Sequence, residues 1–483
     1  KKYRGSLSGE HGDGRIRAPF LKEQFGEIVY QYFVDLKHTF DPDNLFNPGV
    51  ILSDKSILED LRPVVSQQEL TTAFDWRDDL SFYYAVEKCN GAGVCRKSIG
   101  GIMCPSYKAT RGEEFSTRGR ANLLRKALSS EDPTKSLKNS ELKEALDLCL
   151  ACKACKSECP ANVDMAKLKS EYLFQIRNAG SYVKSWHIKN LGYILKIGSK
   201  APDTFNFLQS SFLGRKLIGF ERQPPLLQKK SLSDWWSACK TNNEDCSTTV
   251  WVIVDIFTQY YDVSIGQDVL NLLKKCKVNI KVVFPKNSIV AMVSYGLLNE
   301  AKNELKILHS QLNDAAKNDL IVGIEPSEVL VWRDEAKSLL NGRLPNVLLF
   351  EELLLELDQL KVLPKFHALN TKVWVYEHCH QKSLAETENV IKSLELIPEL
   401  QIEIINGGCC GMAGEFGYKF PEISDTIAHQ SLDNYMSRVG KNDVLVVTGT
   451  SCRKQILDIF SIRSIHWPQL FNNTIKMKVN IEE

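Results

Sequence analysis

The chain has 483 residues, which at roughly 150 residues per domain predicts about three domains. Hydrophobic residues make up 43% and charged residues 25%, an ordinary globular composition, and the net charge of +2 gives no overall field that would select nucleic acid as a partner. No segment approaches the roughly 18 consecutive apolar residues of a membrane-spanning helix, and no secretory signal opens the chain. We expect a cytoplasmic protein, for which a peripheral association with the inner face of the membrane is an alternative, and the missing initiator Met predicts sequence upstream of Lys1.

Glycine, proline and helical patterns divide the first half of the chain. A helical pattern runs from Leu21 to Phe40 and ends at Asp41-Pro42, and Asn47-Pro48-Gly49 is typical of a turn. We expect a mixed fold whose first four parts are the end of an α+β domain at 1–52, a linker at 53–72, an all-α cysteine-rich domain at 73–180 and a helical and loop-like connector at 181–248.

The sequence pattern changes at Thr249, where short runs of β-branched residues begin to alternate with amphipathic helical segments. This alternation predicts βαβ units around a parallel sheet. The expected strands are Val250–Val254, Ile280–Phe284, Leu320–Val322, Lys372–Val375, Ile402–Ile405 and Val444–Val447.

This last part also repeats itself. Val250-Trp251-Val252 matches Val373-Trp374-Val375 at an offset of 123 residues, and Asn318-Asp319 matches Asn442-Asp443 at an offset of 124. We interpret the repeat as two α/β halves of similar design, at 249–345 and 371–470. Coincidental similarity of two ordinary α/β domains is the alternative.

Seven of the fourteen cysteines lie between Cys89 and Cys159, which favours metal ligation in a reducing compartment. The strongest signal is the run Cys149-x2-Cys152-x2-Cys155-x3-Cys159-Pro160. Three thiolates at this spacing can wrap one iron–sulfur cluster, and the fourth cysteine, before proline, typically reaches a second cluster. Structural zinc prefers two cysteine pairs separated by a longer loop and is the weaker alternative.

A second, broken motif precedes this run. Cys89 and Cys95 have the spacing of first and third ligands, but Ala92 stands between them, and Cys104-Pro105 supplies the final cysteine after an insertion. Crossed pairing predicts one [4Fe-4S] site and one site with three ligands, which suits a [3Fe-4S] cluster or a second [4Fe-4S] cluster. A vestigial site beside a single cluster is the alternative. The predicted sets are Cys149, Cys152, Cys155 and Cys104, and Cys89, Cys95 and Cys159.

The segment Gly9-Glu10-His11-Gly12, with Asn47-Pro48-Gly49 after the helix, resembles the C-terminal end of FAD-linked oxidases, and within them the D-2-hydroxy-acid dehydrogenases. The resemblance implies that Glu10 and His11 help remove the substrate hydroxyl proton, or bind a metal that polarises it, and that Asn47 contacts the flavin. In that family the nucleotide-binding domain would lie upstream of Lys1, so these residues alone are expected to bind FAD poorly.

Cysteines also follow strands of the second α/β half, at Cys379, Cys409-Cys410 and Cys452. Loops at the carboxyl ends of parallel strands converge on one crevice, so these thiols could share a metal, cluster or redox site. They resemble the Cys-rich CCG domains of heterodisulfide reductase and of the glycolate oxidase iron–sulfur subunit, with Gly449 in place of one cysteine. Inert structural cysteines are the alternative. The first half has Ile256, Asn287-Ser288 and Glu328 at the corresponding positions and cannot ligate metal through thiolates.

The order of these parts resembles the fused FAD and iron–sulfur D-2-hydroxy-acid dehydrogenases. The resemblance implies a small 2-hydroxy-acid substrate of the D-2-hydroxyglutarate or D-lactate class, FAD, and electron flow through the clusters to a quinone or an electron-transfer protein. Two other classes stay open: a non-catalytic electron-transfer subunit that serves a separate flavoprotein, and a zinc-stabilised interaction protein, which would be colourless and free of sulfide.

Overall fold

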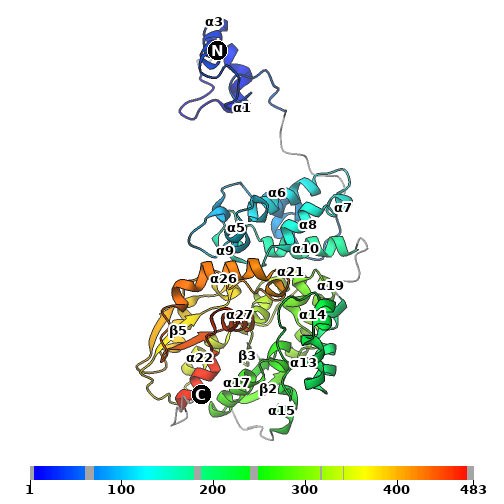
Figure 1. Ribbon diagram of the computed structural model, residues 1–483, viewed down its shortest axis with the longest axis vertical. Helices are drawn as coiled ribbons and strands as arrows, with labels where there is room; N and C mark the ends of the chain where they lie inside the picture. The colour runs from blue at the N-terminus through cyan, green and yellow to red at the C-terminus, as the bar shows by residue number, and fades with distance from the viewer. Residues whose placement is uncertain are drawn as a thin grey trace. The chain divides into compact units, whose positions relative to one another are not determined.

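The computed structural model describes residues 5–59, 70–178, 186–239, 248–315, 318–340 and 342–475. The chain forms two compact units, Lys1–Val64 and Val65–Glu483 (Figure 1). Parts of the expected linker and connector, and Cys246, lie outside the described residues.

In the first unit, the regular elements of residues 5–59 are helices: α1 (Gly14–Arg17), η1 (Ala18–Phe20), α2 (Leu21–Phe25) and α3 (Glu27–Phe40). The predicted helix from Leu21 to Phe40 is interrupted at Gly26, whose φ of +84° is a left-handed conformation that glycine adopts without strain. Asp41 ends α3, as predicted, because its carboxylate accepts hydrogen bonds from the backbone of Leu45 and Phe46.

The second unit begins with a helical region that holds the seven clustered cysteines. A buried carboxylate holds the chain segment that leads into this region. Glu171 on α10 accepts hydrogen bonds from the backbone of Ala73 and Phe74 and from the indole of Trp76. Its elements are η2 (Arg77–Asp79), α4 (Phe82–Glu87), η3 (Val94–Arg96), α5 (Pro105–Thr110), η4 (Glu113–Phe115), α6 (Thr117–Leu128), α7 (Pro133–Ser136), α8 (Ser140–Asp147), α9 (Ala154–Glu158) and α10 (Met165–Asn178).

Short helices of the connector follow, and none of the helices in the described ranges is long and apolar enough to cross a bilayer. The connector helices are α11 (Trp186–Lys189), α12 (Leu191–Gly198), α13 (Pro202–Ser210), α14 (Phe212–Ile218) and α15 (Leu232–Ala238).

Two small parallel sheets then confirm the predicted α/β texture, with every expected strand present within one residue at its start. The first sheet has the order β2-β1-β3-β4 and the second β6-β5-β7, and an isolated parallel bridge of Val446 with Ile465 extends the second sheet at the position that β4 holds in the first. The strands are β1 (Thr249–Ile253), β2 (Asn279–Val283), β3 (Leu320–Gly323), β4 (Val347–Leu348), β5 (Lys372–Tyr376), β6 (Gln401–Ile404) and β7 (Val444–Val447).

The helices of the two halves also follow the same plan. The first half contains α16 (Ile256–Tyr260), α17 (Val263–Lys275), α18 (Ile289–Ser294), α19 (Leu298–Leu312), α20 (Pro326–Arg333), α21 (Glu335–Leu339) and α22 (Phe350–Gln359). The second contains α23 (Cys379–Leu384), α24 (Thr387–Leu394), α25 (Phe416–Lys419), α26 (Pro421–Met436), α27 (Thr450–Phe460) and α28 (Trp467–Ile475).

A matching hydrogen bond in each half is what the interpretation as a repeat leads us to expect. The indole nitrogen of Trp251 donates to Asp319 Oδ2 at 2.8 Å, and that of Trp374 donates to Asp443 Oδ2 at 2.7 Å. These are the residues that the sequence aligns at offsets of 123 and 124. The two halves therefore share both strand order and a tertiary contact.

Candidate iron–sulfur and thiol sites

The run from Cys149 to Cys159 folds as a tight loop around α9. Cys152 lies between Ala151 and Lys153, whose φ angles of +50° and +61° are unusual for residues with a side chain. Such backbone strain gathers where a structure must aim particular groups at one point. Cys152 and Cys155 are buried, and Cys149 and Cys159 are half-buried.

The broken motif lies in the same helical region. Cys104 precedes α5 with a φ of +53°, and its thiol hydrogen-bonds that of Cys95. This hydrogen bond, assisted by the backbone N–H of Arg118, lowers the pKa of Cys95 to about 6. Crossed pairing assigns Cys95 and Cys104 to different clusters, and Cys89 lies buried after α4. The distribution of these ligands stays a prediction.

The donor chemistry of these loops fits iron–sulfur clusters. The sulfur atoms accept backbone hydrogen bonds: Thr117 N lies 3.1 Å from Cys104 Sγ, and Met165 N lies 3.3 Å from Cys155 Sγ. Thiolates are the ligands that iron–sulfur clusters use, and hydrogen bonds to the sulfur atoms tune their potentials. Within the described ranges, no three His, Cys, Asp or Glu side chains converge on the position of a single metal ion.

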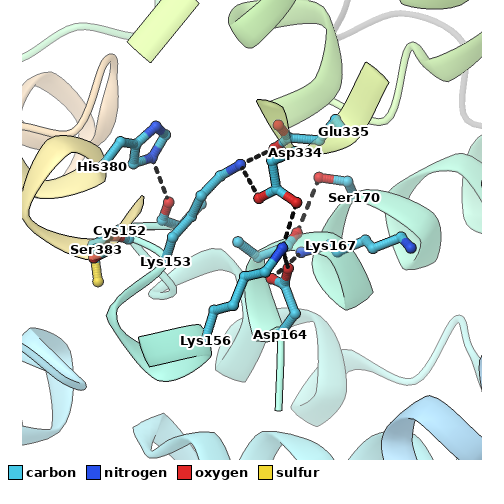
Figure 2. Close-up of polar contacts among 12 residues, drawn as sticks. Cys152, Lys153, Lys156, Asp164, Lys167, Ser170, Asp334, Glu335, His380 and Ser383 are labelled. Carbon is cyan, nitrogen blue, oxygen red and sulfur yellow. Dashed lines mark hydrogen bonds and ion pairs between the residues drawn. The ribbon is translucent and has the colours of Figure 1, made fainter. Parts of the chain in front are cut away.

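A buried ion network anchors the cysteine loop to the first α/β half (Figure 2). Lys153, which is 3% exposed, points toward Asp334 and Glu335 at the start of α21, and its Nζ lies 2.7 Å from Asp334 Oδ2. Lys156 pairs with the other oxygen of Asp334 and lies 3.4 Å from Asp164. Burial opposes the charged form of Lys153, but Glu335 and Asp334 outweigh it and raise its pKa. Lys153 is therefore a buried cation beside the cysteine loop.

The four cysteines of the second half come together in a buried chain of thiol contacts. Cys379 begins α23, Cys409 and Cys410 follow β6, and Cys452 lies on α27. Cys379 hydrogen-bonds Cys409, Cys409 contacts Cys410, and Cys410 Sγ lies 3.3 Å from Cys452 Sγ. The hydrogen bond from Cys409 lowers the pKa of Cys379, with a contribution from the positive charge of His378. The loops thus bring these four thiols close together, and a shared metal, cluster or redox site stays a prediction.

The cysteine that is missing at position 449 has a structural explanation. A Cβ atom added to Gly449 would lie 2.5 Å from Cδ2 of His378, so the imidazole fills the space that a side chain would need. His378 caps α23, and its Nε2 lies 3.9 Å from Cys379 Sγ. Burial opposes its charged form, but the charge of Cys379 outweighs it and raises the pKa of His378 to about 9.

Helix α23 connects this thiol site to the cysteine loop. His380 Nε2 donates to the carbonyl of Ala151 at 2.9 Å, and Ser383 Oγ donates to the carbonyl of Cys152 at 3.3 Å (Figure 2). Burial lowers the pKa of His380 to about 4, which keeps its ring neutral near pH 7. The charge of Cys379 also acts on Cys152, whose pKa is raised first by burial. The two thiol-rich sites are therefore neighbours.

Two carboxylates of the first half occupy positions that match His378 and Cys452 of the second half. Asp255 corresponds to His378 and, like it, caps the helix after the first strand, where it accepts hydrogen bonds from the backbone of Phe257 and Thr258. Glu328 corresponds to Cys452 and accepts hydrogen bonds from the hydroxyl of Ser288 and the start of α18. These carboxylates satisfy helix termini, which explains how this half folds without its cysteines.

Sequence reasoning did not find Lys153, Asp334, Glu335, His380 or Ser383. The lysine stands inside the cysteine run, but its partners lie about 180 residues away, and no local pattern joins them.

The first unit holds the residues expected at a flavin. Glu10 and His11 are 87% and 89% exposed and lie 3.4 Å apart, and Asn47 is exposed in the predicted turn with a φ of +46°. The side chains of Glu10 and His11 are therefore open to solvent. These residues do not by themselves form a binding site for FAD.

Two domain families match this chain. Residues 1–51 match the C-terminal domain of the FAD linked oxidases, and residues 85–163 match the 4Fe-4S dicluster domain. The chain thus combines a match to the end of a flavin-linked oxidase domain with a match to an iron–sulfur domain.

D-2-hydroxyglutarate dehydrogenase of Escherichia coli (strain K12) is 30% identical to the chain over 518 residues, and the match covers 94% of this chain and 50% of that protein. The dehydrogenase of the same name from Pantoea ananatis (strain AJ13355) is 28% identical with the same coverage. The chain spans about half the length of these relatives and resembles their C-terminal half.

A second kind of relative is shorter. One of the subunits of the anaerobic glycerol-3-phosphate dehydrogenase of Escherichia coli (strain K12) is 22% identical over 258 residues, which cover 52% of this chain and 65% of that protein. No solved structure matches the chain.

Proposed function

We propose that the chain is the electron-transferring part of a flavin-dependent dehydrogenase that oxidises a D-2-hydroxy acid, of the D-2-hydroxyglutarate or D-lactate class, to the 2-oxo acid. The observation that carries the proposal is the contact of two thiol-rich sites through α23, where His380 and Ser383 hold the backbone of Ala151 and Cys152. A continuous series of redox groups needs such an arrangement, and the similarity to D-2-hydroxyglutarate dehydrogenases supplies the substrate class.

In this proposal the two predicted cysteine sets hold the iron–sulfur clusters. The buried thiols around Cys410 form the next site in the electron-transfer series. The backbone N–H groups that face Cys95 and Cys155 stabilise negative charge on the sulfur atoms. FAD would supply hydride acceptance and the iron–sulfur clusters would supply single-electron transfer. A quinone or an electron-transfer protein is the acceptor.

The first unit supplies proton chemistry in the same proposal. Glu10 Oε1 lies 3.4 Å from His11 Nε2, so the carboxylate can orient the imidazole, which accepts the substrate hydroxyl proton. Asn47, in the turn after α3, would contact the flavin when the cofactor is bound.

A non-catalytic protein that transfers electrons from a separate flavoprotein is the second candidate. The match to a separate subunit of anaerobic glycerol-3-phosphate dehydrogenase, over 65% of that protein, favours it.

Substrate-dependent cluster reduction separates the two. The experiment uses the full-length protein purified from its native source. Under anaerobic conditions, addition of D-2-hydroxyglutarate or D-lactate should bleach the visible iron–sulfur absorption and produce the EPR signal of a reduced [4Fe-4S] cluster. The L-enantiomers are the matched controls and should leave the spectrum unchanged. Clusters that dithionite reduces, but neither D-substrate does, would support the non-catalytic role and overturn the dehydrogenase.

A further inference from the structure

The connector helices α12, α13 and α14 expose large apolar side chains to solvent. None of the residues of α13 and α14 is buried. The most exposed are Tyr193 (66%), Phe207 (75%), Leu208 (59%), Phe212 (71%), Leu213 (77%) and Leu217 (89%). Single exposed leucines are common on proteins, but six large apolar side chains of this exposure on three successive helices mark an interaction surface.

The helices are nevertheless fixed to the body of the second unit. Asn206 on α13 exchanges two hydrogen bonds with the backbone of Leu227, at 2.9 and 2.8 Å. Phe205 packs against Gly198 and Leu227, and Phe220, after α14, stacks on Tyr418 with ring centroids 4.8 Å apart. One face of these helices is therefore anchored, and the other presents the apolar residues.

Charge complements this face. Residues 186–230 contain eight Lys or Arg residues and two acidic residues, a net charge of +6, whereas the rest of the chain carries a net charge of −4. Lys196, Lys200, Lys216, Lys229 and Lys230 of this same segment are exposed. Figure 1 shows α13 and α14 next to each other at one edge of the second unit, and the two helices pack on each other.

We propose that the exposed face of α12–α14 docks on an anionic lipid bilayer. Short helices with aromatic and leucine side chains on one face and lysines around them lie in the plane of a membrane, with the apolar groups at the boundary of headgroups and acyl chains. The lysines then pair with lipid phosphates. A second copy is a poor occupant because it would bring together two segments of charge +6. This docking surface does not depend on the proposed function.

Vesicle sedimentation tests the proposal with the full chain. The chain should pellet with vesicles of phosphatidylglycerol and phosphatidylcholine, pellet at least tenfold less with phosphatidylcholine alone, and be released in part by high salt. The triple variant Phe212→Ser, Leu213→Ser and Leu217→Ser should lose at least tenfold in binding while its circular dichroism stays unchanged. So should Lys216→Glu combined with Lys230→Glu.

A matched triple variant controls for loss of any exposed apolar residue. Ile307→Ser, Leu360→Ser and Leu457→Ser remove three side chains of 42–48% exposure outside the connector and should leave binding unchanged. Equal binding of the connector variant and the native chain would overturn the proposal. The proposal would also be overturned if the native chain did not bind anionic vesicles but self-associated or bound nucleic acid through Phe212 and Leu217.

Discussion

The ammonium group of Lys153 lies 2.7 Å from a carboxylate oxygen of Asp334, although 181 residues separate the two in sequence. Both side chains are buried, at 3% and 9% exposure. The pair ties the loop of Cys152 and Cys155 to the α/β half that has lost its own cysteines. The first α/β half thus anchors the cysteine loop and places two carboxylates next to it.

Replacing Lys153 by Met should lower the free energy of unfolding by about 3–5 kcal/mol, because it leaves the buried carboxylate of Glu335 without its partner and leaves Asp334 paired with Lys156 alone. Denaturant unfolding measures the change. Lys143→Met is the matched control: its pair with Asp147 is exposed and should contribute less than about 1 kcal/mol. Equal losses for the two variants would show that burial of the Lys153 pair has no energetic weight.

The same pair should tune the cluster potential with opposite signs. A nearby positive charge favours the reduced, more negative cluster, so Lys153→Met should shift the reduction potential of the adjacent cluster to more negative values and Asp334→Asn to more positive values. EPR-monitored redox titration gives both potentials. Shifts in the same direction, or loss of cluster without a shift, would indicate a purely structural role.

Glu328 should make stability depend on pH. Burial raises its pKa to about 8 from an ordinary value of 4.5, so the folded state favours the protonated form. That contribution is complete below about pH 4.5 and is lost as the pH rises toward 8. Glu328→Gln should therefore flatten the fall in unfolding free energy between about pH 5 and pH 8.

Denaturant unfolding at several pH values checks this slope. Glu388→Gln is the control, since Glu388 is exposed in a pair with Lys392 and should leave the slope as it is. An unchanged slope in Glu328→Gln would refute the role of Glu328.

The repeated indole hydrogen bonds should have matching energies. Asp319→Ala and Asp443→Ala each remove the acceptor of a tryptophan N–H and should each lower the unfolding free energy by about 1–3 kcal/mol. Equilibrium unfolding of both single variants tests this. If only one of the two variants lost unfolding free energy, the matching hydrogen bonds would not stabilise the two halves equally.

Local patterns in the sequence predicted a large part of this structure. Strand positions and the two-half repeat followed from β-branched runs and from the matched Trp251 and Trp374. Convergence of Cys379, Cys410 and Cys452 followed from the rule that loops at the carboxyl ends of parallel strands meet.

Other features could not be predicted because they depend on tertiary packing. The ring of His378 fills the space beside Gly449, which only the folded arrangement of α23 and α27 shows. Asp334 meets Lys153 because the cysteine-rich helical region packs on the first α/β half. Local periodicity carries no information on such contacts.

Iron and sulfide analysis with EPR of the anaerobically purified chain tests the central claim that two sets of thiolates hold two clusters. We predict about seven or eight irons per chain with matching acid-labile sulfide, an oxidised three-iron signal when the count is seven, and a reducible [4Fe-4S] centre that Cys152→Ser removes and Cys239→Ser retains. About four irons with no three-iron signal, or zinc without sulfide, would contradict the account.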